Sequence, residues 1–335
     1  MSSIEKAIER LIAKNQKQKN DDGFGVVEDI DKQMPATKEA VTPVPVNRQK
    51  VEAEPVVETA PLNEDKPETI VSQSTARNVV DDREKKICHL DFTQLDHAGY
   101  LVPDTKRQRL SEEYRIIKRP VLMNAFGQGA APVEHGNLVS VTSSTAGEGK
   151  TYTSLNLAIS IAMELDTTIL LIDSDIIKTS LSRLLGVEKE PGLMDVLRNP
   201  DCDLSDVILA TDLPRLKILP AGNTSRNPTE LLASSRMRSL VKEISERYSD
   251  RIILFDAPPL LETTEASVIA GLMGQVLVVV EAGGARTDNI EAAVKVINPE
   301  KVIGMILNKN RYASSSNYYG GYYNAEEIKD EVFGD

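Results

Sequence analysis

The stretch LVSVTSSTAGEGKTYTSLNLAISIAMEL, from Leu138 to Leu165, decides the fold of this chain. It begins with an apolar run typical of a buried strand and ends in a helix-like segment. Small residues lie between the two and lead into Gly149-Lys150-Thr151. A strand, a small-residue loop, a Gly-Lys-Ser/Thr step and a helix, in this order, predict a loop that binds nucleotide phosphates.

Each part of this loop has a predicted role. Backbone N–H groups turn toward phosphate oxygens, the helix dipole points at them, Lys150 reaches the β- and γ-phosphates from a solvent-facing loop, and the Thr151 hydroxyl binds Mg²⁺. The strict pattern has Gly where this chain has Ser144, and a Gly-Lys turn without function is the alternative. The predicted nucleotide-binding residues are Thr145, Ala146, Gly147, Glu148, Gly149, Lys150, Thr151, Tyr152 and Asn308.

Further apolar runs predict an α/β domain with a mostly parallel sheet flanked by helices on both faces. These runs alternate with helix-like segments, and ligands of such sheets bind at the carboxyl ends of the strands. The predicted strands are 138–143, 168–173, 216–220, 251–256, 275–281 and 302–308.

Carboxylates follow two of these strands, as Asp173-Ser174-Asp175 and as Asp256. An acidic residue at a strand end can hold Mg²⁺, and a second carboxylate can orient or deprotonate an attacking hydroxyl. Aspartates are also common in ordinary turns, which is the alternative for each motif alone. We predict Lys150, Asp173, Asp175 and Asp256 as catalytic, and Thr151, Asp173 and Asp256 as Mg²⁺ ligands.

The segments STAGEGKT, ILLIDSD, IILFDAPP, LPAGNTSRNPTELLASSRMRSL and GMILN resemble the bacterial tyrosine kinases, relatives of the MinD and ParA P-loop ATPases. The resemblance covers roughly residues 87–323, and MSSIEKAIERL and LSEEYRIIKRP are most similar to the subgroup associated with exosortase-linked exopolysaccharide loci. It implies an ATP- and Mg²⁺-dependent tyrosine autokinase that regulates exopolysaccharide synthesis or export. Two positions distinguish this chain from its relatives. Thr145 stands where the MinD and ParA ATPases have a lysine. Ile177, followed by Lys178, stands where many bacterial tyrosine kinases have an arginine.

The resemblance also implies partners. It implies a homo-oligomer, with a ring favoured, a membrane-embedded polysaccharide co-polymerase as activator, and a phosphotyrosine phosphatase. Glu112, Arg115 and Lys118 resemble the ExxRxxR oligomerisation motif, with Lys in place of the last Arg. Arg119 could take that role instead, and an ordinary solvated charged face is the alternative.

Four regions are predicted along the chain: an amphipathic helix at 1–14, a disordered linker at 15–85, the kinase domain at 86–311 and a tyrosine-rich tail at 312–335. The tail carries five of the nine tyrosines among Ser, Asn and Gly. An inert low-complexity terminus is the alternative. The resemblance implies that the phosphate acceptors are Tyr312, Tyr318, Tyr319, Tyr322 and Tyr323.

Composition narrows the function classes. The formal charge of −12 argues against a nucleic-acid partner, and the two cysteines, Cys88 and Cys202, lack metal-site spacing and are predicted to be free thiols. Without a signal peptide or membrane span the chain is predicted to be cytoplasmic, recruited to the inner face of the cell membrane by a partner. A MinD- or ParA-type ATPase switch and a catalytically idle nucleotide-binding scaffold remain alternatives.

Overall fold

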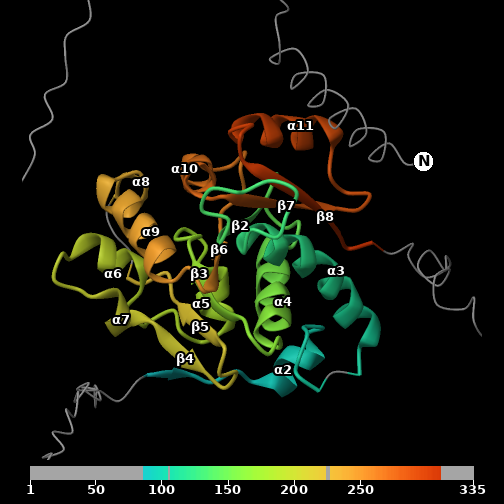
Figure 1. Ribbon diagram of the computed structural model, residues 1–335, viewed down its shortest axis with the longest axis horizontal. Coiled ribbons are helices and arrows are strands. Elements are labelled where there is room, and N and C mark those ends of the chain that lie inside the picture. The colour runs from blue at the N-terminus through green and yellow to red at the C-terminus, as the bar shows by residue number, and fades with distance from the viewer. Residues whose placement is uncertain (1–85, 105, 224–226, 311–335) are drawn as a thin grey trace, which may run out of the picture. The chain divides into compact units, whose positions relative to one another are not determined.

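The central sheet consists of eight strands within residues 86–104, 106–223 and 227–310, which the computed structural model describes. The strands are β1 (Ile87–Cys88), β2 (Leu138–Ser143), β3 (Thr168–Asp173), β4 (Leu209–Thr211), β5 (Leu216–Leu219), β6 (Arg251–Asp256), β7 (Gln275–Glu281) and β8 (Val302–Asn308). Their order is β1-β4-β5-β3-β6-β2-β7-β8 (Figure 1), and only the β4–β5 pair among them is antiparallel. The predicted mostly parallel sheet is confirmed.

The strand predictions agree closely with the structure. Five of the six predicted strands have the predicted bounds, and β5 ends one residue earlier, at Leu219. The strands β1 and β4 were not predicted. With two and three residues, they are too short for an apolar period to stand out.

Helices cover both faces of the sheet, as predicted (Figure 1). Successive strand residues face opposite sides, so Val139 and Val141 belong to one buried cluster and Leu138 to the other. The first face is covered by α2 (Phe92–His97), α3 (Gln108–Ala125), α4 (Lys150–Ala162) and α5 (Ser180–Leu184). The second is covered by α6 (Leu193–Arg198), α7 (Leu204–Val207), α8 (Pro228–Leu232), α9 (Ser235–Arg247), α10 (Thr264–Leu272) and α11 (Thr287–Val296).

Burial explains why the central strands read as continuous apolar runs. Both sides of β2, β3, β6 and β7 lie under helices, and every residue of β2 is buried. Two hydrophobic layers of this kind hold the strand ends in a fixed arrangement, which positions the loops that follow them.

Several predictions concern parts of the chain outside the described residues. These are the helix at 1–14, the linker at 15–85 and the tyrosine-rich tail at 312–335 with its five acceptors. Within the part of the chain that the structure describes, no helix combines the length and the apolar character needed to cross a membrane.

Candidate active site

The sheet register brings the predicted motifs together. Asp173 of β3 is paired in register with Asp256 of β6, and Val141 of β2 is paired with Asp256 on the other side. These three strands are adjacent and parallel, so the loop after β2 and both acidic strand ends lie at one edge. The predicted meeting of the motifs at the carboxyl end of the sheet is confirmed.

The backbone conformation favours glycine at position 149, and the Asn308 side chain lies close to it. Gly149 precedes α4 with φ of +98°, in the left-handed region. A Cβ atom there would lie 2.0 Å from Asn308 Nδ2, and this amide donates a hydrogen bond to the carbonyl of Glu148 at 2.9 Å. Asn308, at the end of β8, therefore holds the loop from a strand that is separated from β2 by β7.

Glu148 stabilises the loop from inside. Its side chain is buried, and its Oε2 accepts hydrogen bonds from the Ser144 hydroxyl at 2.7 Å and from the Thr145 N–H at 2.8 Å. Ser144, the departure from the strict pattern, thus supplies a hydrogen bond that glycine could not make. The Glu148 carboxylate and the Thr145 N–H are used within the loop, which differs from their predicted contact with nucleotide.

Lys150 is buried rather than solvent-facing. Its Nζ lies 2.6 Å from Asp175 Oδ2, and the two side chains are 8% and 1% exposed. Burial alone lowers the pKa of Lys150, but the nearby carboxylates of Asp256 and Asp175 outweigh it and hold the pKa above its usual value. The lysine is therefore charged and is directed into the cluster of carboxylates.

Asp256 offers an oxygen suited to a metal ion. Its Oδ1 accepts a hydrogen bond from Ser154 Oγ at 3.0 Å, whereas its Oδ2 is buried and has no hydrogen-bond partner among the described residues. Burial raises the pKa of Asp256, while the charge of Lys150 and the nearby Thr151 and Ser154 hydroxyls oppose that shift. The free Oδ2 and the Thr151 hydroxyl are oxygen donors of the kind that Mg²⁺ prefers.

These two donors fit Mg²⁺ that arrives with a nucleotide rather than a metal held by protein alone. Within the described residues no group of three or more His, Cys, Asp or Glu side chains could hold a metal ion. Magnesium at nucleotide sites usually takes one or two protein carboxylates, with phosphate and water oxygens completing its shell. Asp256 and Thr151 satisfy that requirement.

Asp173 is a predicted Mg²⁺ ligand, but both of its carboxylate oxygens accept hydrogen bonds from within the protein. Its Oδ2 accepts from the Ser182 N–H at 2.8 Å and the Ser182 hydroxyl at 2.6 Å, and its Oδ1 accepts from the Asp175 N–H at 3.2 Å. Burial, followed by the charge of Asp256, raises the pKa of Asp173 to about 7. With both oxygens engaged, Asp173 ties the start of α5 to β3 instead of presenting a free ligand.

Tyr152 directs its side chain away from the loop. The hydroxyl donates to the carbonyl of Gly99 at 2.8 Å, and the ring centroid lies 4.9 Å from that of Tyr100. Its predicted contact with nucleotide is therefore limited to the backbone, where the first N–H groups of α4 lack carbonyl partners within the helix.

The predicted oligomerisation motif on α3 is split. Lys118 is buried, donates to the carbonyl of Ser160 at 2.8 Å and pairs with Glu164 at 2.5 Å. Lys118 therefore fastens α3 to α4, which does not fit the alternative of an ordinary solvated charged face at this position. Glu112 and Arg115 are exposed and pair with each other.

Sequence reasoning missed three contributors to the site. Ser154 contacts Asp256, Ser182 contacts Asp173, and the Glu262 carboxylate accepts a hydrogen bond from the Ala146 N–H of the loop. The spacing of Ser154, one helical turn after Lys150, could have indicated a hydroxyl on the same side of α4. No local pattern marks Ser182 or Glu262.

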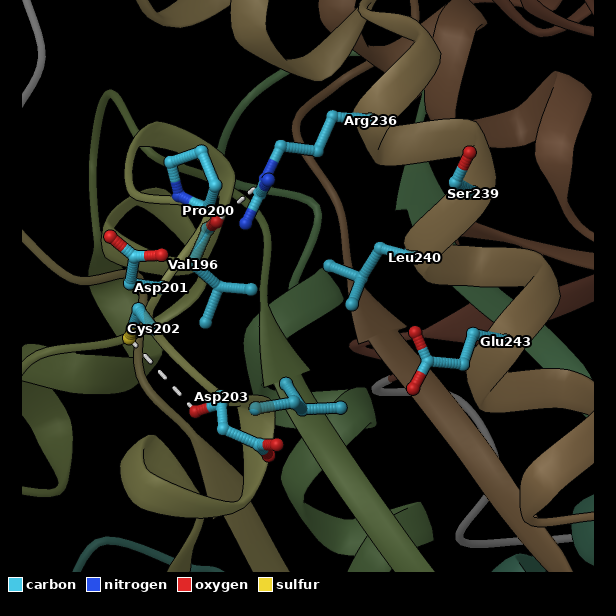
Figure 2. A pocket seen from close by; sticks show the side chains of 10 residues that line it. Val196, Pro200, Asp201, Cys202, Asp203, Arg236, Ser239, Leu240 and Glu243 are labelled. Atoms are coloured by element: carbon cyan, nitrogen blue, oxygen red, sulfur yellow. Dashed lines mark hydrogen bonds between the residues drawn. The ribbon is translucent and has the colours of Figure 1, made fainter.

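A hollow lies between the α6–α7 connection and α9 (Figure 2). It has a volume of about 350 Å³, and its lining includes Asp201, Asp203 and Glu243. The Arg236 guanidinium donates to the carbonyls of Val196 and Asn199, both at 2.8 Å. Three carboxylates disfavour an anionic nucleotide here, and none of the predicted site residues within the described part of the chain lines this hollow.

A glycine-bearing loop between a buried strand and a helix, a charged lysine at its end and carboxylates on adjacent strand ends define a P-loop protein. A family profile described as an AAA domain matches residues 136–302.

Known proteins make the assignment more specific. The chain is 32% identical over 195 residues to tyrosine-protein kinase CpsD of Streptococcus agalactiae, covering 56% of this chain and 82% of that protein. It is 31% identical over 181 residues to tyrosine-protein kinase Ptk of Acinetobacter johnsonii, covering 53% of this chain and 24% of that longer protein. The solved VpsO kinase domain has 31% identity and a TM-score of 0.52, over 61% of this chain and 98% of that domain. The chain belongs to the bacterial tyrosine-protein kinases and is a protein-tyrosine kinase.

Proposed function

We propose that this kinase transfers the γ-phosphoryl group of ATP to tyrosines of its own C-terminal tail. The observation that carries the proposal is the buried cluster of Lys150, Asp175 and Asp256 directly behind the phosphate-binding loop. Charged groups of both signs next to a phosphate cradle suit a reaction that depends on alignment and charge neutralisation. The acceptors are Tyr312, Tyr318, Tyr319, Tyr322 and Tyr323.

Nucleotide binding would rearrange the Lys150–Asp175 pair. The phosphate chain carries several negative charges and competes with Asp175 for the ammonium group of Lys150. When Lys150 turns to the phosphates, Asp175 loses its cationic partner, and its Oδ2 is left to accept a hydrogen bond from another donor. Lys150 therefore neutralises the transferred group, and Asp175 becomes available to the incoming hydroxyl.

In the transfer step, the tyrosine oxygen forms a bond to the γ-phosphorus while the bond from that phosphorus to the bridging oxygen breaks. ADP leaves with that oxygen, and Asp175 accepts the phenolic proton. A free tyrosine has a pKa of about 10, so a placed carboxylate assists at neutral pH.

Thr151 and Asp256 are the proposed ligands of Mg²⁺, because the Asp256 Oδ2 is a buried carboxylate oxygen without a hydrogen-bond partner among the described residues. The metal supplies charge neutralisation for the phosphates when it is bound. Asp173 is proposed as a positioning residue, because its carboxylate accepts hydrogen bonds from the N–H groups of Ser182 in α5 and of Asp175.

The tail of one subunit would enter the site of a neighbour in a homo-oligomer, with a ring as the favoured assembly. An exposed apolar stripe supports this proposal. Ile116 and Met123 of α3 are 52% and 46% exposed on the same helical side as Glu112 and Arg119, and the C-cap residue Phe126 is 37% exposed. Apolar side chains flanked by charges are suited to contact another protein.

We further propose that the kinase regulates exopolysaccharide synthesis or export from the cytoplasmic side of the cell membrane. The support is the resemblance of MSSIEKAIERL and LSEEYRIIKRP to the subgroup associated with exopolysaccharide loci. The partners would be a membrane-embedded polysaccharide co-polymerase that activates the kinase and a phosphotyrosine phosphatase that reverses it.

Incubation of the purified full chain with Mg-ATP, followed by mapping of phosphotyrosines, tests the activity. We expect phosphate on the tail in the wild type and none after Asp175→Asn. ATP hydrolysis without phosphotyrosine, also in the presence of the activator's cytoplasmic fragment, would contradict the autokinase and favour a nucleotide switch.

A further inference from the structure

Glu262 lies beside the phosphate-binding loop although it follows β6 in sequence. The segment that carries it is attached to the start of the loop by two backbone hydrogen bonds. The N–H of Leu260 donates to the carbonyl of Ser143 at 2.8 Å, and the N–H of Leu261 donates to that of Ser144 at 3.2 Å. Glu262 is thus held close to the loop by its own backbone.

Its two carboxylate oxygens have different partners. Oε1 accepts a hydrogen bond from the Ala146 N–H, which belongs to the row of loop amides between Ser144 and Lys150. Oε2 lies 3.6 Å from the Nζ of Lys178. Glu262 therefore joins a loop amide to a cation that belongs to the segment after β3.

Both side chains of this ion pair are open to solvent. Glu262 is 39% exposed and Lys178 is 47% exposed. Exposed ion pairs are screened by solvent and exchange partners readily, unlike the buried Lys150–Asp175 pair. The Glu262–Lys178 pair is consequently easier to break than the Lys150–Asp175 pair.

We propose that Glu262 competes with the phosphates of the nucleotide for the loop, and that its displacement releases Lys178 to bind the phosphate chain. A carboxylate and a phosphate both accept hydrogen bonds from backbone amides and repel each other, so they cannot share the Ala146 N–H. Lys178 is an unbranched cation with rotatable donors and can follow the incoming negative charge. This inference rests on the proposed nucleotide binding and adds a residue pair that sets its affinity.

The substitution Glu262→Gln isolates the competition. Glutamine keeps the length and an acceptor oxygen for the Ala146 N–H but removes the charge. We expect the dissociation constant for Mg-ATP to fall roughly tenfold, the factor expected for one charge-assisted hydrogen bond. If Glu262 only stabilised the conformation of the loop, Glu262→Gln would weaken the binding of Mg-ATP instead.

Lys178 is tested in the same background. Once Glu262 is neutral, Lys178→Ala should raise the dissociation constant for Mg-ATP roughly fivefold, because a cation next to the phosphates is lost. No change in this double variant would overturn the role given to Lys178.

Glu281→Gln is the matched control. Glu281 ends β7 at the same edge of the sheet, and its carboxylate pairs with Lys309 at 3.1 Å. The substitution removes the same charge as Glu262→Gln. We expect the dissociation constant for Mg-ATP to change less than roughly twofold, because the effect acts over a long range and is screened by salt. Equal tightening in both variants would overturn the competition in favour of general electrostatics.

Binding is measured by calorimetry on the full chain, with thermal melts of each variant. Unchanged or weaker binding by Glu262→Gln, while the wild type binds Mg-ATP, overturns this inference and leaves the proposed function intact. Failure of the wild type itself to bind Mg-ATP would overturn the proposed function and this inference together.

Discussion

Lys150 Nζ and Asp175 Oδ2 lie 2.6 Å apart, with both side chains almost completely buried. The loop lysine is thus neutralised inside the protein by a carboxylate that is 25 residues away in sequence. A buried pair of this kind contributes little net stability, but removal of one partner leaves an uncompensated charge.

The first prediction follows from this pair. Lys150→Met should abolish autophosphorylation and also lower the free energy of unfolding by about 3–5 kcal/mol, because Asp175 stays buried without its cation. Adding Asp175→Asn should restore part of the stability, since the stranded charge disappears. Urea unfolding of the single and double variants measures both effects, and a double variant less stable than Lys150→Met would contradict the coupling.

The second prediction concerns the metal. Asp256→Asn should remove the Mg²⁺ dependence of ATP binding and reduce autophosphorylation by roughly 100-fold or more, because the oxygen without a partner is lost as an anionic ligand. Calorimetry with Mg²⁺ and with EDTA provides the measurement.

Asp173→Asn is the matched control for that experiment. Its carboxylate already accepts from Ser182, so the amide should disturb stability while ATP binding remains Mg²⁺-dependent. Loss of Mg²⁺ dependence in this variant, with retention in Asp256→Asn, would exchange the roles assigned to the two aspartates.

The third prediction separates two neighbouring residues on α3. Lys118→Met should lower the free energy of unfolding by about 1–3 kcal/mol, because the Ser160 carbonyl loses a charged donor. Arg119→Ala, on the exposed side, should change stability by no more than about 0.5 kcal/mol but weaken self-association. Thermal denaturation and light scattering of both variants distinguish packing from assembly. The opposite pattern would show that Lys118 reaches a neighbouring subunit.

The fourth prediction uses the two cysteines, which are free as predicted. Burial, followed by the charge of Asp212, raises the pKa of Cys88 to about 11, and its side chain is 2% exposed. At pH 8 the reactive thiolate is therefore scarce at Cys88, and the partly exposed Cys202 should be alkylated at least roughly 100-fold faster. Mass spectrometry of peptides after timed iodoacetamide treatment tests the difference. Equal rates in native protein, with Cys202→Ser as control, would place Cys88 outside the folded core.

The local sequence pattern alone was enough to predict the strands, the phosphate-binding loop and the acidic residues at the strand ends. An apolar run, a Gly-Lys-Thr step and a terminal aspartate are each written in a few consecutive residues, so their interpretation needs no knowledge of distant partners. The arrangement of these motifs at one edge also followed, because parallel strands align their carboxyl ends.

Tertiary packing decided which of the predicted groups are available for chemistry. Lys150 and Lys118 were visible as charges, but their burial depends on Asp175 and Ser160, which lie in other elements. The engagement of Asp173 by Ser182 and the contact of Glu262 with a loop amide 116 residues away likewise exist only after the sheet has formed. Side-chain type establishes what a residue can bind, whereas the partner it meets depends on long-range packing that no short stretch of sequence contains.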